Sequence, residues 1–328
     1  MGLLLAAAHL CACDRTPETP TVVVYTSVDE EFARQIFADF EKASGVRVEP
    51  LFDTEAGKTT GLVRRLGREA AAPRCDVWWS SEILGTIELA RGGVLEAYDP
   101  PSAADIPHAW RDAEHRWTAV AARARVLAFH TGRVRRDELP ATWRELATPA
   151  WCRRLALANP GFGTTRGHVA AMFAYWGEQP AQAFLRNLRD AQSQLADGNS
   201  HAVRLVVSGA ADVCLTDTDD VWVAQRRGHL VDLAYPALDA GLPAVWIPCT
   251  VALVRGGPHG QTGRRLVDHL AGAATERALA GSDSRNVPLR PALRAELGIR
   301  DEPQPLDYAR IADALPRASA AVADILLR

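Results

Sequence analysis

The stretch that decides the fold spans residues 21–51 and reads TVVVYTSVDEEFARQIFADFEKASGVRVEPL. It begins with TVVVY at 21–25, a β-branched run that suits a buried parallel strand. A second strand is expected at 46–51. Between them, apolar residues recur at helical spacing until a helix-ending Gly45: Phe32, Ile36, Phe37 and Phe40. Strand, helix and strand in this order are typical of a βαβ unit.

The same alternation continues through the rest of the chain. Further strands are expected at 75–79, 117–129, 154–158, 211–215 and 245–254. Further helices are expected at 61–70, 80–92, 165–176, 199–207, 219–227, 262–280 and 308–327. The sequence therefore predicts open parallel α/β sheets in two lobes, with more than one crossover between the lobes.

Length and composition agree with a two-lobed body. A chain of 328 residues favours two lobes over one, and a net charge of −3 gives no basic field for nucleic acid. After the first dozen residues, no apolar stretch reaches the ~20 residues that a membrane helix needs. The expected parts are a signal and tether (1–20), a first lobe (21–122 and 251–300), a second lobe (123–250), and a C-terminal helix (301–328) packing on the second lobe.

The N-terminus indicates export. Residues 2–10 (GLLLAAAHL) are almost wholly apolar, and Cys13 follows small residues in a pattern that resembles the lipobox of bacterial lipoproteins. This resemblance implies lipidation of Cys13, a polar tether at 14–20, and anchoring to the periplasmic face of the cytoplasmic membrane. No Lys or Arg precedes the apolar run, where signal peptides normally carry one. The alternative is a buried N-terminal helix with incidental cysteines.

Four further cysteines are widely spaced, and no CxxC motif argues for zinc: Cys75, Cys152, Cys214 and Cys249. An exported protein has three ways to pair them, and spacing does not choose among these. Cys75 and Cys214 lie in apolar, strand-like runs, where buried free thiols are the usual interpretation.

Several expected strands end in hydroxyl, amide or carboxylate residues. These are Thr26, Ser27, Ser80, Ser81, Thr164, Thr165, Asn199, Ser200, Asp217, Thr218 and Asp219. Ligands of open α/β sheets bind beyond the carboxyl ends of strands, where helix N-termini favour anions. Each such residue alone is explained as a helix cap, and Ser27 with Glu30 predicts a capping box. Their recurrence in both halves indicates a ligand site.

The segment 161–167 (GFGTTRG) offers two interpretations. Its glycines allow close backbone approach to a ligand, and its threonines cap a helix that can face an oxyanion. It also fits G-x-S-x-G loosely, with Thr165 as nucleophile, which is the basis of an α/β-hydrolase alternative. The histidines available to that alternative lie in no recognisable context: His201, His229, His259 and His269.

The acidic loop Asp217-Thr218-Asp219-Asp220 also has two interpretations. Its carboxylates suit a hard cation. Equally, they suit a helix N-cap followed by first-turn acids that complement the helix dipole. Arg123 and Arg125 lie nearby in the expected crossing strand, and they either add positive charge to the site or support interlobe pairs.

Nearly the whole chain from residue 21 onward resembles the ferric-iron-type periplasmic solute-binding proteins of ABC importers. The matching runs are 22–48, CDVWWSSEILGTIELARGGVLEAY at 75–98, AARARVLAFHT at 121–131, HAVRLVVSGAADVCLTDTDD at 201–220, and PCTVALVRG at 248–256. The resemblance implies the type II periplasmic binding protein fold: two α/β lobes, a hinge of crossing strands, and a ligand cleft between the lobes.

The resemblance also shows a departure at the metal site. Iron-binding members hold the metal with a histidine, a glutamate and two adjacent tyrosines. Here Asp29 lies near the histidine position and Ser81, followed by Glu82, at the glutamate position, while Thr218 and Asp219 replace the tyrosines. No two tyrosines are adjacent anywhere in the chain. The sequence therefore resembles a subgroup that lacks the phenolates selecting ferric iron.

The family's anion site matches better, at Thr164, Thr165, Gly167 and Asn199. We therefore expect a binding protein, not an enzyme, which captures a phosphate- or phosphonate-bearing anion and delivers it to an ABC permease. It is expected to act as a monomer without a cofactor; handing the solute to a chemoreceptor is the alternative to transport. The expected ligand-binding residues are Thr26, Ser27, Ser81, Thr164, Thr165, Gly167, Asn199, Ser200, Asp217, Thr218 and Asp219, with the two aspartates contacting hydroxyls or an amine. The alternative is ferric iron or another metal with an anion, held by Asp29, Glu55, Glu82, Asp217 and Asp219.

Overall fold

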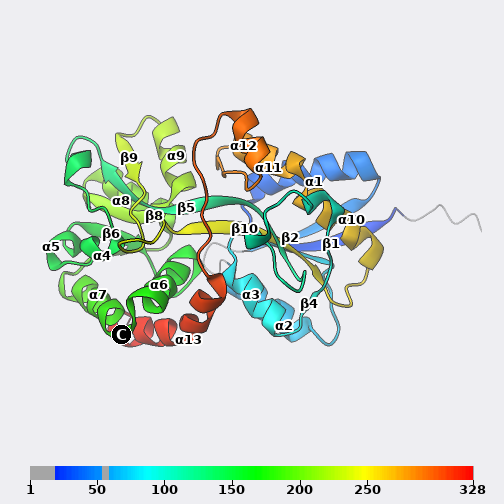
Figure 1. The fold of residues 1–328 in the computed structure, drawn as a ribbon, viewed down its shortest axis with the longest axis horizontal. Coiled ribbons are helices and arrows are strands. Elements are labelled where there is room, and N and C mark those ends of the chain that lie inside the picture. The colour runs from blue at the N-terminus through cyan, green and yellow to red at the C-terminus, as the bar shows by residue number, and fades with distance from the viewer. Residues whose placement is uncertain (1–18, 54–58, 328) are drawn as a thin grey trace, which may run out of the picture.

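Two long strands run side by side through the middle of the molecule and join its two lobes (Figure 1). They are β5 (Thr118–His130) and β10 (Trp246–Val254). The first half of β5 pairs antiparallel with β10, from Thr118 to Ala124. Its second half pairs antiparallel with β8 (Val213–Asp217), from Arg125 to Phe129. The change of partner falls between Ala124 and Arg125, so Arg123 and Arg125 both lie where the lobes meet.

The computed structural model describes residues 19–53 and 59–327. Cys13 and Glu55 lie outside the described residues. In the described part of the chain, no helix is long and apolar enough to cross a membrane.

The first lobe is built on parallel strands with β10 added antiparallel. Its strands are β1 (Thr21–Thr26), β2 (Arg47–Phe52), β3 (Val77–Ser80) and β4 (Leu95–Glu96). Its helices are α1 (Glu30–Ser44), α2 (Thr60–Glu69), α3 (Leu84–Arg91), α10 (Gly260–Ala271), α11 (Ala273–Gly281) and α12 (Pro291–Leu297). Short 3-10 turns lie at Pro101–Ala103 and His108–Trp110.

The second lobe continues the same sheet in the order β5, β8, β6 and β7, with β9 on β5. Its further strands are β6 (Leu155–Ala158), β7 (Gln194–Ala196) and β9 (Val231–Ala234). Its helices are α4 (Trp143–Leu146), α5 (Pro149–Cys152), α6 (Gly163–Trp176), α7 (Glu178–Asp190), α8 (Asn199–Ser208) and α9 (Thr218–Arg226), with a 3-10 turn at Arg136–Glu138.

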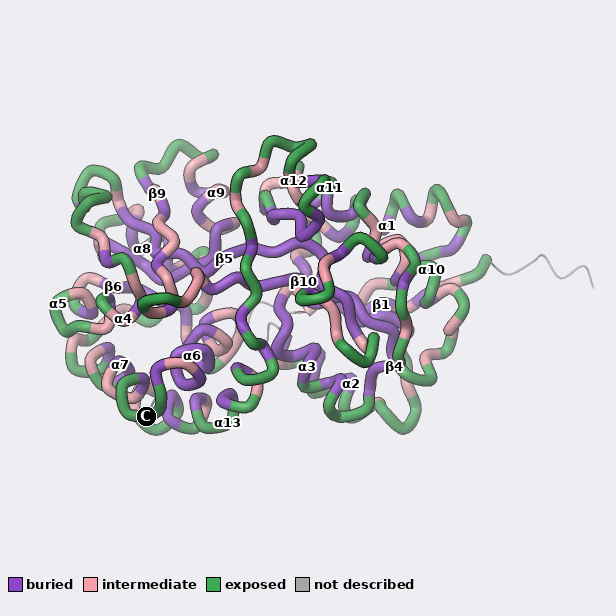
Figure 2. Tube along the Cα trace, in the orientation of Figure 1, coloured by how far each residue is buried: buried purple, intermediate pink, exposed green. Residues whose placement is uncertain are grey.

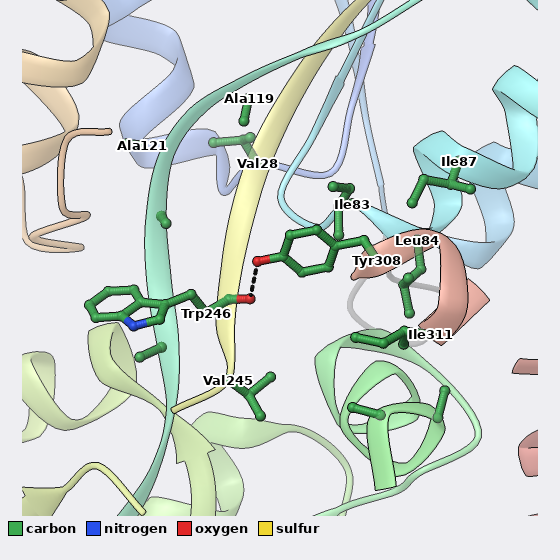
Figure 3. Close-up of a cluster of buried hydrophobic side chains, with 14 of the residues drawn as sticks. Val28, Ile83, Leu84, Ile87, Ala119, Ala121, Val245, Trp246, Tyr308 and Ile311 are labelled. Atoms are coloured by element: carbon green, nitrogen blue, oxygen red, sulfur yellow. Dashed lines mark hydrogen bonds between the residues drawn. The ribbon is translucent and has the colours of Figure 1, made fainter. Parts of the chain in front are cut away.

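The strands form the buried centre of both lobes, and the helices expose their outer faces (Figure 2). The last helix, α13 (Tyr308–Ile325), packs against α6, α7 and α3. Its first residue ties it to the crossing strands, because the Tyr308 hydroxyl donates to the Trp246 carbonyl at 2.9 Å (Figure 3). Around this bond lie Ile83, Leu84 and Ile311, so apolar contacts link α13 to both α3 and β10. The division of the chain into numbered lobe segments stays a prediction.

The structure differs from the sequence prediction in several places. Strand β10 is antiparallel to both neighbours, so the sheet is mixed. The helix expected at 262–280 is broken by Gly272, which is extended at φ −77° and ψ 157°. Helices α4, α5, α7 and α12 and strands β4, β7 and β9 were not predicted. The capping box is wrong: the N-cap of α1 is Asp29, and the Ser27 hydroxyl accepts instead from the Ser81 N–H at 3.0 Å.

Candidate ligand-binding cleft

A cleft of about 610 Å³ opens between the two lobes. The first lobe contributes residues at the carboxyl ends of β1 and β3 and the segment after α11. The second lobe contributes the first turns of α6, α8 and α9. Charged and polar lining residues include Asp29, Ser81, Glu82, Arg123, Thr164, Asn199, Ser200, Arg204, Asp217, Asp219, Asp220 and Asn286. The volume is that of a small-molecule site.

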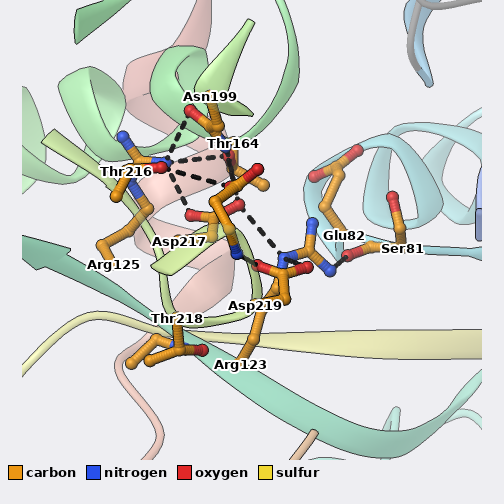
Figure 4. Close-up of polar contacts among 12 residues, drawn as sticks. Ser81, Glu82, Arg123, Arg125, Thr164, Asn199, Thr216, Asp217, Thr218 and Asp219 are labelled. Carbon is orange, nitrogen blue, oxygen red and sulfur yellow. Dashed lines mark hydrogen bonds and ion pairs between the residues drawn. The ribbon is translucent and has the colours of Figure 1, made fainter. Parts of the chain in front are cut away.

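Asp217 is the centre of a hydrogen-bond network in the wall of the cleft (Figure 4). Its Oδ1 accepts from Arg125 Nη1 at 2.6 Å. Its Oδ2 accepts from Thr164 Oγ1 at 2.8 Å, Asn199 Nδ2 at 2.9 Å and Arg123 Nε at 3.1 Å. Burial alone would raise the pKa of Asp217, but Arg125 and Arg123 outweigh it and hold that pKa below its ordinary value. The Asp217 carboxylate therefore accepts hydrogen bonds from Thr164 and Asn199, two residues that were expected to bind the ligand.

Arg125 donates several hydrogen bonds within this network. Its side chain is fully buried, and it donates to Thr164, Thr165 and Asn199 as well as to Asp217. Its Nε also lies 3.5 Å from Nδ1 of His168, whose pKa is far below its ordinary value because of burial and the Arg125 charge. Arg125 is thus a structural cation whose donors are directed to protein groups.

Arg123 reaches across the cleft. Its Nε pairs with Asp217, while its Nη1 donates to the Ser81 carbonyl at 2.7 Å in the first lobe. It also lies 3.7 Å from an oxygen of Asp219. Burial would lower the pKa of Arg123, but Asp219 and Asp217 raise it above its ordinary value, so the guanidinium stays charged.

Three acidic residues lie at the N-terminal end of α9. Carboxylate oxygens of Asp217, Asp219 and Asp220 lie within 4.8 Å of one another. Burial, opposed by Arg123 and reinforced by Asp220 and Asp217, raises the pKa of Asp219 to about 8. Asp220 accepts from Ser200 Oγ at 2.6 Å and from Thr216 Oγ1 at 3.1 Å. At neutral pH Asp219 is largely protonated, which makes it a donor to an anion or a group that releases its proton to a cation.

Helices α6 and α8 both begin in the lining of the cleft. Their N-cap residues are Phe162 and Gly198, and within the described chain no side chain caps either end. The first N–H groups of a helix have no intrahelical partner and carry partial positive charge. The two helix ends therefore offer backbone donors to an oxyanion in the cleft.

The first-lobe wall is held by side chain-to-backbone bonds. Glu82 caps α3 by accepting from Leu84 N at 2.6 Å and Gly85 N at 2.9 Å. Burial raises the pKa of Glu82, while these backbone bonds oppose that rise. The carboxylate is committed to the helix end, which weakens the hypothesis that Glu82 is a metal ligand.

The structure brings most of the predicted ligand-binding residues together. Those in the cleft lining are Ser81, Thr164, Thr165, Asn199, Ser200, Asp217 and Asp219. Four others have structural contacts and do not line the cleft: Thr26, Ser27, Gly167 and Thr218. Thr26 Oγ1 accepts from Val28 N, and Thr218 Oγ1 accepts from Ala124 N. Gly167 is tight, since a Cβ there would lie 3.1 Å from Leu84.

Sequence reasoning missed several lining residues as ligand contacts: Asp197, Arg204, Cys249, Ser284 and Asn286. Arg204 had a usable signal, because it follows Ser200 by one helical turn on α8. Asn286 had none, because it lies in an irregular segment between α11 and α12.

The structure contradicts the hydrolase alternative. Thr165 is 1% exposed, and its hydroxyl oxygen accepts from Arg125 Nη2 at 3.2 Å. A nucleophile needs a base within hydrogen-bond reach and access to substrate. Thr165, which occupies the nucleophile position of the motif, instead accepts a hydrogen bond from the buried Arg125.

Cys75, Cys152, Cys214 and Cys249 are all free and buried. The interpretation of Cys75 and Cys214 as buried free thiols is therefore confirmed. Burial raises the pKa of each thiol, in Cys152 and Cys249 to about 11.

Comparison with known proteins decides the family. Residues 88–313 match the family described as bacterial extracellular solute-binding protein. The chain belongs to this family. The predicted membership among ABC-importer binding proteins of the ferric-iron type, and the prediction that the protein is not an enzyme, are confirmed.

Two curated relatives and one solved structure are similar to this solute-binding protein over most of its length. It is 25% identical to the major ferric iron-binding protein of Neisseria gonorrhoeae, over 84% of this chain and 82% of the relative. It is 24% identical to the Salmonella typhimurium protein named "Putative 2-aminoethylphosphonate-binding periplasmic protein", over 74% of this chain and 69% of the relative. Iron-bound HitA from Pseudomonas aeruginosa superposes with a TM-score of 0.81 at 23% identity, covering 94% of this chain and 99% of HitA. The type II periplasmic binding protein fold is confirmed.

Proposed function

We propose that this solute-binding protein captures a small phosphate- or phosphonate-bearing anion in its cleft and delivers it to an ABC permease. The observation that carries the proposal is the convergence of α6 and α8, whose N-termini line one cleft without side-chain caps in the described chain. Such ends bind oxyanions through backbone N–H groups. The Salmonella relative, named for a phosphonate, supports this ligand class.

Arg204 adds an exposed positive charge beside those helix ends. It is exposed on α8 and lines the cleft, whereas Arg123 and Arg125 are paired with Asp217. A cation at this position attracts a phosphoryl group, and neither buried arginine has to leave its Asp217 partner. Hinge closure then brings Ser81 of the first lobe toward the bound anion.

A second candidate is ferric iron or another metal bound together with an anion. The observation that favours it is the clustering of Asp217, Asp219 and Asp220, with Asp29 in the same lining. The gonococcal relative, named for ferric iron, supports it. Against it stand the four donors that already occupy Asp217 and the missing tyrosine pair.

Ligand-dependent thermal unfolding of the purified protein tests the proposal. The ligands are phosphate, sugar phosphates, alkyl- and aminoalkylphosphonates, and ferric iron with and without citrate. A ligand at 100 times its Kd adds about 2.7 kcal/mol of stability, which moves Tm by several degrees. Stabilisation by an organic phosphate or phosphonate without metal supports the proposal. Stabilisation by ferric iron alone overturns it in favour of the second candidate.

Arg204→Ala tests the site, and Arg227→Ala, which removes an exposed arginine elsewhere in the second lobe, is its matched control. Arg227 is exposed at the end of α9 and does not line the cleft. We expect Arg204→Ala to weaken anion binding roughly three- to tenfold, because an exposed charged contact contributes modestly. Arg227→Ala should leave the Kd unchanged.

We also propose that the protein works in the periplasm as a monomer, anchored by a lipid on Cys13. The relatives' periplasmic location and the lipobox-like sequence support this placement. Metabolic labelling with palmitate in a bacterial host tests it. Labelling of the wild type, lost in Cys13→Ser, supports the anchor; equal membrane association of the two proteins contradicts it.

A further inference from the structure

Strand β5 carries one residue more than its partner β10 in the stretch that leads to the second lobe. Val120 and Ala121 of β5 together lie opposite the single Cys249 of β10. Ala121 has a φ of 57°, in the left-handed region that residues other than glycine rarely adopt. The structure therefore has a β-bulge in a strand that joins the lobes.

This bulge decides which side chains of β5 reach the cleft. Side chains alternate between the two faces of a strand, so one inserted residue moves all later ones to the opposite face. Arg123 and Arg125 follow the bulge, and both direct their guanidinium groups to Asp217 in the cleft wall (Figure 4). In a β5 without the extra residue, Ala122 and Ala124 would take that face instead. The bulge therefore sets the direction in which both arginines point.

A buried carboxylate of the first lobe holds the bulge. Glu276 on α11 is 0% exposed, and its Oε1 accepts from the Ala121 N–H at 3.1 Å and from the Leu289 N–H at 2.8 Å. Its Oε2 lies 3.0 Å from Nη1 of Arg290, which is 2% exposed. Arg290 in turn donates to two backbone carbonyls of the first lobe, at 2.6 and 2.8 Å. Glu276 is thus fixed within the first lobe while it bonds to the crossing strand.

The bulge presents a backbone donor that Glu276 satisfies. An inserted residue is left unpaired in the ladder between the strands, and a buried N–H without an acceptor costs free energy. We propose that Glu276 is a positioning residue for solute binding: it holds the bulge at Ala121 and thereby directs Arg123 into the cleft. Glu276 itself does not line the cleft. It acts through Arg123, whichever solute the cleft takes.

Two double variants that differ only at position 276 test the proposal. Arg290→Met with Glu276→Gln and Arg290→Met with Glu276→Leu both remove the buried charges, so neither leaves an ion without its partner. The Glu276→Gln side chain keeps an oxygen that accepts from the Ala121 N–H, whereas the Glu276→Leu side chain, of similar size, has no acceptor.

The readout without ligand is the rate at which N-ethylmaleimide labels Cys249 in the native full-length protein, mapped by peptide mass spectrometry. Cys249 is 1% exposed and faces the bulge, and its Sγ lies 4.0 Å from Arg123 Nη1, so a displaced Arg123 uncovers the thiol. We expect labelling of Cys249 to be at least tenfold faster with Glu276→Leu than with Glu276→Gln, while Cys214 stays equally slow in both. Adding Ala121→Gly to the Glu276→Leu variant should slow the labelling of Cys249 at least threefold, because glycine adopts the left-handed conformation without strain.

Calorimetric titration with inorganic phosphate and with ferric citrate measures the effect on solute binding. For the probe that the wild type binds, Kd should be at least tenfold higher in the Glu276→Leu variant than in the Glu276→Gln variant. Equal Kd values in the two variants overturn the proposal. Binding of neither probe by the wild type counts against the proposed function and its metal alternative, and the labelling rates then decide the role of Glu276.

Two labelling results overturn the proposal. Equal labelling of Cys249 in the two double variants would mean that an acceptor at position 276 does not hold the bulge. A parallel rise at all four cysteines in the Glu276→Leu variant would show that Glu276 only supports the fold.

Discussion

Arg125 and Asp217 form an ion pair that is closed off from solvent: Nη1 lies 2.6 Å from Oδ1, and the two side chains are 0% and 2% exposed. Arg125 lies on the strand that joins the lobes, and Asp217 ends the strand that leads into α9. The pair therefore fixes the floor of the cleft before any ligand enters. Buried pairs of this kind contribute little net stability, but removing one partner leaves an unpaired buried charge.

The first prediction concerns this pair. Arg125→Met should lower the free energy of unfolding by about 3–5 kcal/mol, because Asp217 stays buried without its closest cation. Arg125→Met with Asp217→Asn should recover at least half of that loss, since the neutral amide needs no counter-charge. Urea unfolding of the three proteins at pH 7 measures both effects. A single variant within about 1 kcal/mol of the wild type would contradict the buried pair.

Thr165 gives the second prediction. Its oxygen accepts from Arg125, so it acts through the arginine and not on the solute. Thr165→Val should cost about 1.5–3 kcal/mol of stability, the usual effect of removing one bond to a charged group. Solute affinity should change less than tenfold, because the backbone N–H groups of α6 remain. Urea unfolding and calorimetry together check this; abolished binding with full stability would place Thr165 in contact with the solute.

The third prediction is the inertness of the thiols. Cys75, Cys152, Cys214 and Cys249 are buried, and burial raises the pKa of each thiol, so little thiolate is available at pH 8. We expect an aromatic disulfide reagent to titrate none of the four in the native protein and all four in guanidinium. As guanidinium is raised, Cys249, which lines the cleft, should be the first of the four to become reactive.

Local patterns were sufficient to predict the main strands and many of the helices of the fold. Strand β1 was expected at 21–25 and is found at Thr21–Thr26, because its β-branched run is decided within a few residues. The direction of β10 was not predictable in this way. Its partners β3 and β5 lie far away in sequence, and an apolar run looks the same in a parallel or antiparallel sheet.

The candidate site was predicted in outline and not in its bonding. Strand-end residues such as Asn199 and Asp217 were expected in the cleft, because helix N-termini must gather there. The pairing of Arg125 with Asp217 joins residues 92 positions apart, and no periodicity links them. The unpartnered oxygen of Asn286 is a property of packing in an irregular segment, and only the folded chain shows it.

Asp219 gives the fourth prediction, on pH. Its pKa rises from 3.8 to about 8 on folding, chiefly by burial. The folded state therefore binds this proton more tightly than the unfolded state does. The stabilisation is fully present below pH 4 and is lost as pH rises toward 8, by at most about 1.4 kcal/mol per pH unit.

Asp219→Asn removes this proton linkage. Relative to the wild type, the variant should gain stability between pH 5 and pH 8, by at least about 1 kcal/mol across the range. Urea unfolding of both proteins without ligand at each pH unit provides the measurement. A constant difference between the two proteins over that range would show that Asp219 ionises with an ordinary pKa.

The last prediction concerns closure of the cleft. Arg226 on α9 forms an ion pair with Asp283, in the segment after α11, and the Arg285 guanidinium lies 5.4 Å from the centre of the Trp222 ring. Both contacts join the second lobe to the first at a distance from the solute. Because the charged side chains are 45% and 49% exposed, the ion pair contributes less than about 1 kcal/mol.

Asp283→Arg should therefore weaken solute binding no more than about fivefold, with a smaller effect at 0.5 M salt than at low salt. Exchange of the two charges, Arg226→Asp with Asp283→Arg, should restore affinity. If the exchange instead stays as weak as Asp283→Arg, these two residues do not hold the lobes together in the bound state.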